Sequence, residues 1–84
     1  MIAQLIQAVA QLNLAAGISN ALDQKLDNAL DAWLAENAEQ RSDAVNKMLA
    51  FINAVEAQRA KKITNADADM LIRRANEIIR ALQQ

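Results

Sequence analysis

Residues 64–82, TNADADMLIRRANEIIRAL, hold the clearest structural signal in the chain. Thr64-Asn65-Ala66-Asp67 has the form of a capping box, although such boxes prefer Glu or Gln at the fourth position. Apolar residues then recur every three or four positions, as they do on one face of a helix. They are Leu71, Ile72, Ala75, Ile78, Ile79 and Leu82. The stretch therefore predicts a helix that Thr64 caps.

The same periodicity predicts a first and a second helix near the start of the chain. The first helix has its apolar face on Ile2, Leu5, Ile6, Val9 and Leu12. Because Gly17 reaches positive φ without a steric cost, we expect it to end that helix or to shape the turn. Ser19 or Asn20 would then cap the second helix, with Asp23 in its first turn. The apolar face of the second helix is Leu22, Leu26, Ala29, Leu30, Trp33 and Leu34.

A third helix is expected after a polar loop at residues 37–42. It would begin near Ser42 with Asp43 early in it, and Arg59, Lys61 and Lys62 would lie at its end, where cations are favourable. Its apolar positions span an arc wide enough to contact two neighbouring helices. They are Val45, Met48, Leu49, Phe51, Ile52 and Val55. Short loops make successive helices antiparallel, so we predict an all-α, antiparallel up-down four-helix bundle, with one domain over residues 1–84.

The composition excludes several classes of chemistry. The chain has 84 residues, 54% of them hydrophobic, with no cysteine and no histidine. Disulfides, thiol catalysis, zinc sites of the usual kind and histidine acid–base chemistry are therefore excluded. The three hydroxyl side chains, Ser19, Ser42 and Thr64, lie at expected helix starts with no histidine to activate them. We predict that the protein is not an enzyme and needs no cofactor.

Neither a membrane span nor a targeting segment is expected. The longest stretches without a polar residue, residues 14–18 and 48–52, are far shorter than the roughly 18 residues that a span needs. The first positive side chain is Lys25, so we expect no secretory signal and no arginine-rich presequence in this chain. The net charge of −1 gives no overall attraction to nucleic acid or to anionic lipid.

Asn65, Asp67 and Asp69 resemble the opening of a calcium loop, with oxygen ligands at alternate positions. Such a loop requires glycine at its sixth position and a bidentate glutamate at its twelfth, where this chain has Met70 and Asn76. The apolar periodicity also predicts that the segment is helical. We therefore expect no metal site, and interpret the two aspartates as acids at a helix N-terminus.

Asp23, Asp27 and Asp31 follow one another at intervals of one helical turn. Paired carboxylates serve in catalysis when their surroundings separate their pKa values, and nothing in the sequence provides this. We interpret the row as a solvated acidic face. Trp33 would suit a sugar if it were exposed, but it continues the apolar register of Leu26 and Leu30, so we expect core packing. A carbohydrate-binding role stays open as a lesser alternative.

Residues 57–84 hold six Lys and Arg against three Asp and Glu, an excess of three positive charges. A helix with Arg73, Arg74 and Arg80 could follow a phosphate backbone. However, Asp69, Arg73 and Glu77 are spaced for pairs within the helix, and no aromatic residue is present here to stack on bases. We do not expect nucleic-acid binding.

Residues 1–22 contain no charged side chain, although 23% of the chain is charged. The expected outward positions of the first helix carry the neutral amides of Gln4, Gln7 and Gln11, flanked by small residues at Ala3, Ala8 and Ala10. Either this is chance in a helix rich in alanine and glutamine, or a partner covers the face. On the second interpretation the interface comprises Gln4, Gln7, Ala8, Gln11 and Ala3.

Several stretches resemble FIMAH-like helical modules. They are LAFINAVEAQ at residues 49–58, KKIT at residues 61–64, ADMLI at residues 68–72, residues 75–79, and the second-helix opening from Ala16-Gly17-Ile18 through Lys25 and Leu26. One departure is Ala60, where such modules often carry glycine before the Lys-Lys turn. The resemblance implies a small non-catalytic domain of a secreted or surface bacterial protein, and hence an extracellular or cell-surface location. It supplies no catalytic residue.

These observations together predict a non-catalytic module for protein interaction or attachment, an accessory domain of a secreted or surface bacterial protein. The alternative is a stand-alone structural subunit that assembles with copies of itself. The expected partner is accordingly another protein or a second copy of the chain.

Overall fold

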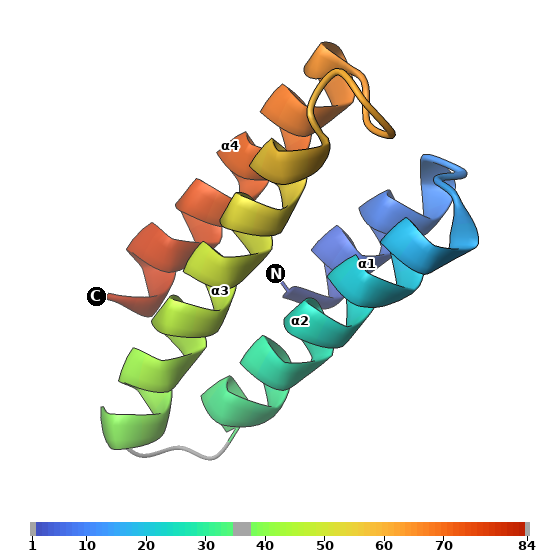
Figure 1. The fold of residues 1–84 in the computed structure, drawn as a ribbon. Coiled ribbons are helices and arrows are strands. Elements are labelled where there is room, and N and C mark those ends of the chain that lie inside the picture. Colours follow the sequence, from blue (N-terminus) through green and yellow to red (C-terminus); the bar gives the residue numbers. More distant parts are fainter. Residues whose placement is uncertain (1, 35–37, 84) are drawn as a thin grey trace.

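The structure, a computed structural model, describes residues 2–34 and 38–83, and for residues 38–41 it describes the backbone alone. The described chain forms α1 (Ile2–Gln11), α2 (Ala16–Leu34), α3 (Ala38–Gln58) and α4 (Asn65–Leu82), without a strand. Successive helices run in opposite directions (Figure 1), and each helix contacts the two beside it but not the one diagonally opposite. The predicted all-α, antiparallel four-helix bundle is confirmed.

One apolar stripe from each helix meets in the centre of the bundle. Phe51 on α3 is the largest fully buried side chain, and no polar or charged residue of the described chain is buried. Buried alanines, such as Ala29 and Ala75, let neighbouring helices approach closely. The other fully buried large side chains are Leu5, Leu22, Leu26, Met48, Ile63, Leu71, Val9 and Val55. The predicted apolar faces therefore supply most of the core.

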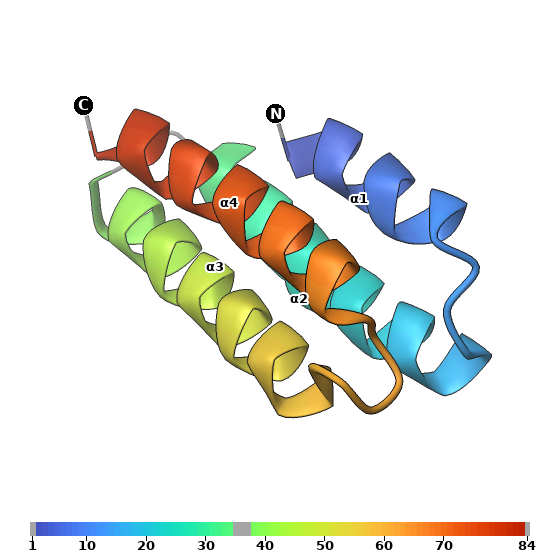
Figure 2. The ribbon, with the colours of Figure 1, turned by 90° about the horizontal axis from the view of Figure 1, so that it is seen from above.

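The first helix is the short member of the bundle. It has 10 residues, whereas α3 has 21, so α1 is about 15 Å long and α3 about 31 Å. Figure 2 shows α1 along one side of the bundle, beside α2 and α4, with α3 on the far side. The contact between α1 and α4 is the least extensive of the four helix pairs. The seam between these two helices is therefore the most open part of the bundle.

The expected role of Gly17 is wrong. The turn after α1 instead places Asn13 at a φ of 53°, and Gly17 lies in the first turn of α2 with no positive φ. Asparagine tolerates this left-handed region better than most residues with a Cβ. The expected caps Ser19 and Asn20 are wrong for the same reason, because the Ser19 N–H already donates a helical hydrogen bond of 2.9 Å to the Ala15 carbonyl. Asp23 accordingly lies beyond the first turn.

The expected loop at residues 37–42 is wrong over residues 38–42, which belong to α3; residue 37 lies outside the described residues. The segment lacks apolar periodicity, but alanine, glutamate, glutamine and arginine are all strong helix formers. Ser42 and Asp43 therefore lie within α3 rather than at its start, and Asp43 pairs with Lys47 one turn later at 3.7 Å.

Two leucines assigned to apolar faces are exposed. Leu34, at the end of α2, is 64% exposed and Leu49 is 45% exposed. Ala32 and Ala44 are buried instead. Trp33 is half-buried and packs against the core, in agreement with its expected register.

The loop between α3 and α4 is a compact turn. Ala60 has a φ of 60°, and its N–H donates a 2.8 Å hydrogen bond to the carbonyl of Ile63. The N–H of Ile63 donates in turn to the carbonyl of Gln58 at 3.1 Å. Ile63 is 1% exposed, so the turn is anchored in the core. Ala60 holds the left-handed conformation that glycine adopts at little cost, which explains physically why a glycine would fit there.

Arg59 joins this turn to the ends of both adjoining helices. Its guanidinium pairs with Glu56 on α3 at 2.8 Å and with Asp69 on α4 at 2.7 Å, and it also donates to the Asn65 carbonyl at 3.4 Å. The expectation that Asp69 pairs with Arg73 within α4 is therefore wrong, because Asp69 pairs across the turn instead. The turn is held by charge as well as by the burial of Ile63.

The predicted cap of the last helix is confirmed. The Thr64 side chain accepts a hydrogen bond of 3.2 Å from the backbone N–H of Asp67, and Thr64 has the extended backbone of an N-cap residue. Asp67 lies in the first turn, where its negative charge suits the helix dipole.

We predict that Ala60→Gly stabilises the protein by about 1 kcal/mol, because glycine removes the strain of a left-handed alanine and loses only part of this gain to its greater freedom when unfolded. Thermal denaturation followed by circular dichroism measures the change. Ala50→Gly, at an exposed position in the interior of α3, is the matched control and should destabilise by about 1 kcal/mol. Equal destabilisation by both variants would contradict the assigned strain.

We also predict that Thr64→Ala lowers the free energy of unfolding by about 0.5–2 kcal/mol, because the N–H of Asp67 loses its acceptor. Chemical denaturation of Thr64→Ala and of Thr64→Ser measures both free energies of unfolding. The comparison separates the contribution of the hydroxyl from that of the rest of the side chain. Serine should retain most of the stability. An alanine variant as stable as the parent chain would show that the cap contributes nothing.

Candidate functional site

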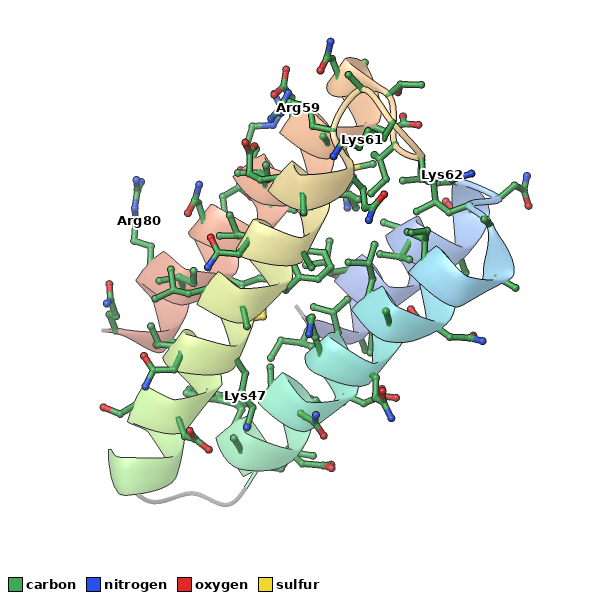
Figure 3. The ribbon with its side chains drawn as sticks, in the orientation of Figure 1. Lys47, Arg59, Lys61, Lys62 and Arg80 are labelled. Atoms are coloured by element: carbon green, nitrogen blue, oxygen red, sulfur yellow. The ribbon has the colours of Figure 1, made fainter. Side chains whose placement is uncertain are left out.

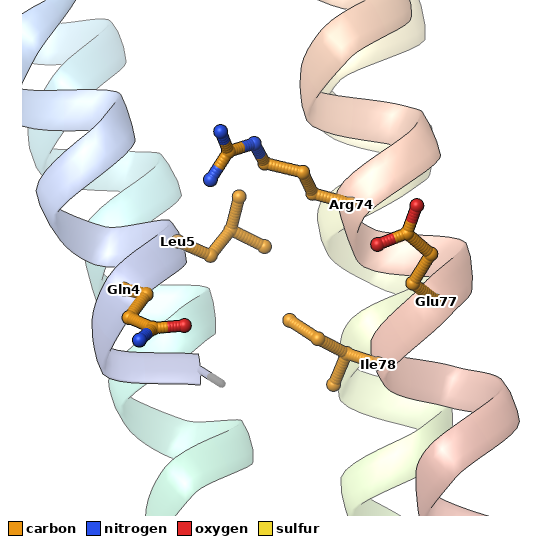
Figure 4. A pocket seen from close by; sticks show the side chains of 5 residues that line it. All are labelled: Gln4, Leu5, Arg74, Glu77 and Ile78. Carbon is orange, nitrogen blue, oxygen red and sulfur yellow. The ribbon is translucent and has the colours of Figure 1, made fainter.

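An open groove runs along the seam between α1 and α4. Its larger hollow is about 460 Å³, and its lining residues come from these two helices and from Leu12, which directly follows α1. They are Gln4, Gln7, Ala8, Gln11, Leu12, Met70 and Arg74. A smaller hollow of about 130 Å³ continues the groove over Leu5, Glu77 and Ile78 (Figure 4). The groove lies where the contact between α1 and α4, the least extensive in the bundle, leaves the seam open.

Helical periodicity places the amides of α1 beside the groove. Ile2, Leu5 and Val9 form the buried stripe of this helix. Gln4 and Gln11 lie on the flank of that stripe that faces α4, and both are exposed. Ala8 lies between them and is half-buried, so the wall of the groove is low at its middle.

On the other side, α4 presents a flank next to its own buried stripe. Leu71, Ala75 and Ile78 point to the core, and Met70, Arg74 and Glu77 lie to the side that faces α1. Figure 4 shows the Arg74 side chain extending from α4 toward α1 above Leu5. Within the part of the chain that the structure describes, Arg74 makes no ion pair.

The structure brings together four of the five predicted interface residues. Gln4, Gln7, Ala8 and Gln11 line the groove, whereas Ala3 lies on the other flank of α1. There it borders a second hollow of about 180 Å³ with Ile2, Leu30, Trp33 and Leu34. The role of all five residues as an interface stays a prediction.

Sequence reasoning missed the α4 side of the groove. In the sequence, Arg74 stands out only as one of several cations, and Met70 only as the residue at the position where a calcium loop requires glycine. The signal that could have found them is their spacing, because Met70, Arg74 and Glu77 recur at four and three residues along one side of the core stripe. Only the folded bundle shows which helix this side of α4 faces.

The aspartates of the segment that resembles a calcium loop, residues 65–69, make other interactions. Asp67 belongs to the capped first turn of α4, and Asp69 is paired with Arg59. Across residues 2–34 and 38–83 there is no group of three or more acidic side chains arranged to hold a metal ion. The expected absence of metals and cofactors stays a prediction.

The aspartate row on α2 is only partly solvated. Asp27 and Asp31 are exposed, but Asp23 is half-buried and its Oδ1 is buried without a hydrogen-bond partner among the described residues. Burial raises the pKa of Asp23 above its ordinary value, and the charge of Asp27 raises it further. The ionised carboxylate therefore weakens the folded state, and we assign it no binding role.

Several positive side chains lie far apart along the bundle. Figure 3 shows Lys61 and Lys62 at the α3–α4 turn, Arg80 near the C-terminal end of α4 and Lys47 on the opposite half of α3. Arg59 is engaged with two carboxylates. This spread does not suit a nucleic-acid backbone, which needs a continuous row of cations. No described helix is long and apolar enough to cross a membrane.

The three hydroxyl residues are separated in the fold. Ser19 lies within α2, Ser42 lies within α3, and Thr64 uses its oxygen to cap α4. The chain has no histidine to activate any of them. An all-α bundle of four short helices with an open groove between its first and last helices defines the class of small helical modules.

The comparison with protein families agrees with this class. The FIMAH domain model matches residues 2–80, nearly the whole chain, and the chain therefore belongs to the FIMAH family of small helical accessory domains. The resemblance noted in the sequence is thus confirmed. No protein with a curated description and no solved structure matches the chain.

We predict that Asp23→Asn raises the melting temperature at neutral pH, because it removes an ionised group with a buried, unpaired oxygen. A raised pKa means that the folded chain binds more protons than the unfolded chain just above the unfolded value of 3.8. Stability should therefore fall as the pH rises through the pKa of folded Asp23, and then level off. Thermal denaturation between about pH 3 and pH 7 should show a weaker fall in the variant.

The exposed Asp31 supplies the control, because Asp31→Asn makes the same chemical change without burial. A lower melting temperature for Asp23→Asn than for the parent chain at neutral pH would contradict the prediction. It would mean that the carboxylate of Asp23 has a partner in solution.

Proposed function

We propose that this FIMAH domain is a non-catalytic accessory module of a secreted or surface bacterial protein, and that it acts by binding another protein through the groove between α1 and α4. The observation that carries the proposal is the uncharged wall of this groove. Gln4, Gln7 and Gln11 form that wall, and no charged side chain occurs before Asp23. Membership of an accessory-domain family supports the same role.

A wall of amides suits a surface that a partner covers. Removing ions from water costs far more free energy than removing neutral amides, and each amide offers both donors and an acceptor to a partner. Ala8, half-buried between Gln4 and Gln11, lets an incoming backbone approach α1 closely. The groove can therefore be covered at low cost.

Two alternatives have less support. Carbohydrate sites commonly use an aromatic platform, and Trp33 packs against the core beside the second hollow rather than in the groove. A stand-alone subunit that assembles with itself would use the same uncharged wall, so the oligomeric state of the chain separates it from the accessory module. The extracellular or cell-surface location belongs to the accessory proposal and rests on the family alone.

We predict that the double substitution Gln4→Glu with Gln11→Lys abolishes binding through the groove, because it places two ions where a partner would exclude water. The net charge stays constant, so an effect reports local burial. Affinity capture from the culture fluid of the source organism should yield a protein that the parent chain retains and the double variant loses. Analytical ultracentrifugation of the purified chain should show a monomer.

Gln24→Glu with Asn53→Lys is the matched control, because Gln24 and Asn53 are exposed amides on α2 and α3, away from the groove. It should capture the same protein as the parent chain. Equal capture by all three chains would contradict the proposed function. A parent chain that self-associates, with only the Gln4/Gln11 variant monomeric, would favour the self-assembling subunit.

A further inference from the structure

Arg74 is the single charged residue among the seven that line the larger hollow. It is exposed and reaches from α4 across the seam toward α1 (Figure 4). Three of the other lining residues are glutamines, and the remaining three, Ala8, Leu12 and Met70, are apolar. Among the described residues no carboxylate pairs with its guanidinium. The centre of the groove therefore carries an unneutralised positive charge.

The residues around Arg74 indicate on which side of its guanidinium a carboxylate would bind. Glu77, the nearest acid along α4, lines the smaller hollow at one end of the groove. The other end, toward Gln11 and Met70, has no acidic residue in its lining. A bound carboxylate would be repelled by Glu77 and attracted by Arg74, so it is expected on the Met70 side of the guanidinium.

The shape of the α1 wall favours a helix as the occupant. Gln4, Gln7 and Gln11 recur at three and four residues, which places them in a row along α1 that spans about 10 Å. The antiparallel α1 and α4 form the two sides of a trough, as in complexes where an amphipathic helix lies in a groove. The lining contains no aromatic residue for stacking on a sugar ring.

We infer that the groove between α1 and α4 binds an acidic helix of a partner protein, with one carboxylate of that helix on Arg74 and its uncharged polar residues along the glutamine row. The inference rests on the proposed function, which it extends to the chemistry of the partner. A guanidinium can hold a carboxylate through two parallel hydrogen bonds, and the bound helix would itself shield that pair from part of the competing water.

The test uses the purified 84-residue chain, labelled with ¹⁵N, and an alanine-rich helical peptide of about 15 residues that carries glutamate every fourth position and glutamine between. The peptide should shift the side-chain amide signals of Gln4, Gln7 and Gln11 and the Nε signal of Arg74. The same peptide with glutamine in place of every glutamate should bind roughly tenfold more weakly.

Protein variants assign the effect to one side chain. Arg74→Gln should weaken the acidic peptide roughly tenfold, and Arg74→Lys should keep part of the affinity because it keeps the charge. Arg73→Gln is the matched control, since Arg73 precedes Arg74 on α4 and does not line the groove. Circular dichroism should show that all three variants retain the fold of the parent chain.

Each contrary outcome overturns the inference in a distinct way. Equal weakening by Arg73→Gln and Arg74→Gln would show general electrostatic attraction. Equal binding of the acidic and neutral peptides at the groove would remove the acidic preference and leave the proposed function intact. Binding of alginate but not of the peptide would identify an acidic glycan as the occupant, and self-association lost in Arg74→Gln would identify a second copy. Absence of any groove signal would also overturn it, while the Gln4/Gln11 capture experiment decides the proposed function separately.

Discussion

The bundle depends on burying one narrow apolar stripe from each of four helices around Phe51. Only large side chains contribute much area, and α1 supplies just Ile2, Leu5 and Val9 as buried residues. Alanines at the contacts bring the longer helices close together, so that a chain with two aromatic residues still fills its centre. Every other feature, including the groove, follows from how these stripes are brought into contact.

The limited contact between the short α1 and α4 links the fold to the candidate site. A helix of 10 residues cannot cover the side of α4, which has 18. Even where α1 is present it contacts α4 little, so the flank of α4 that carries Arg74 stays open beside α1. Helical periodicity places the row of glutamines at the edge of the bundle rather than in its core. The limited packing between α1 and α4 thus leaves an open surface that is lined by glutamines, apolar residues and one arginine.

The sequence predicts the fold well where local chemistry dominates. The Thr64 cap follows from one residue type and the apolar stripes follow from periodicity. The cap and most of the stripe residues are found as expected, although Leu34 and Leu49 are exposed. The prediction failed at Gly17, because Asn13 takes the left-handed turn, and at residues 38–42, where polar helix formers continue α3. For the candidate site, the sequence identified the α1 wall but not Arg74. The role of Arg74 depends on which helix its side of α4 faces, and only the packed bundle determines this.

The pattern of helix contacts also bears on how the chain folds. Three of the four contacts join helices that are neighbours in the sequence, so only short loops close when they form. The contact between α1 and α4 joins the two ends of the chain and is the least extensive, and we expect it to form last and to open first. We therefore expect the two walls of the groove to move relative to each other more than any other pair of neighbouring helices. A helix bound between them would hold the first helix of the chain against the last.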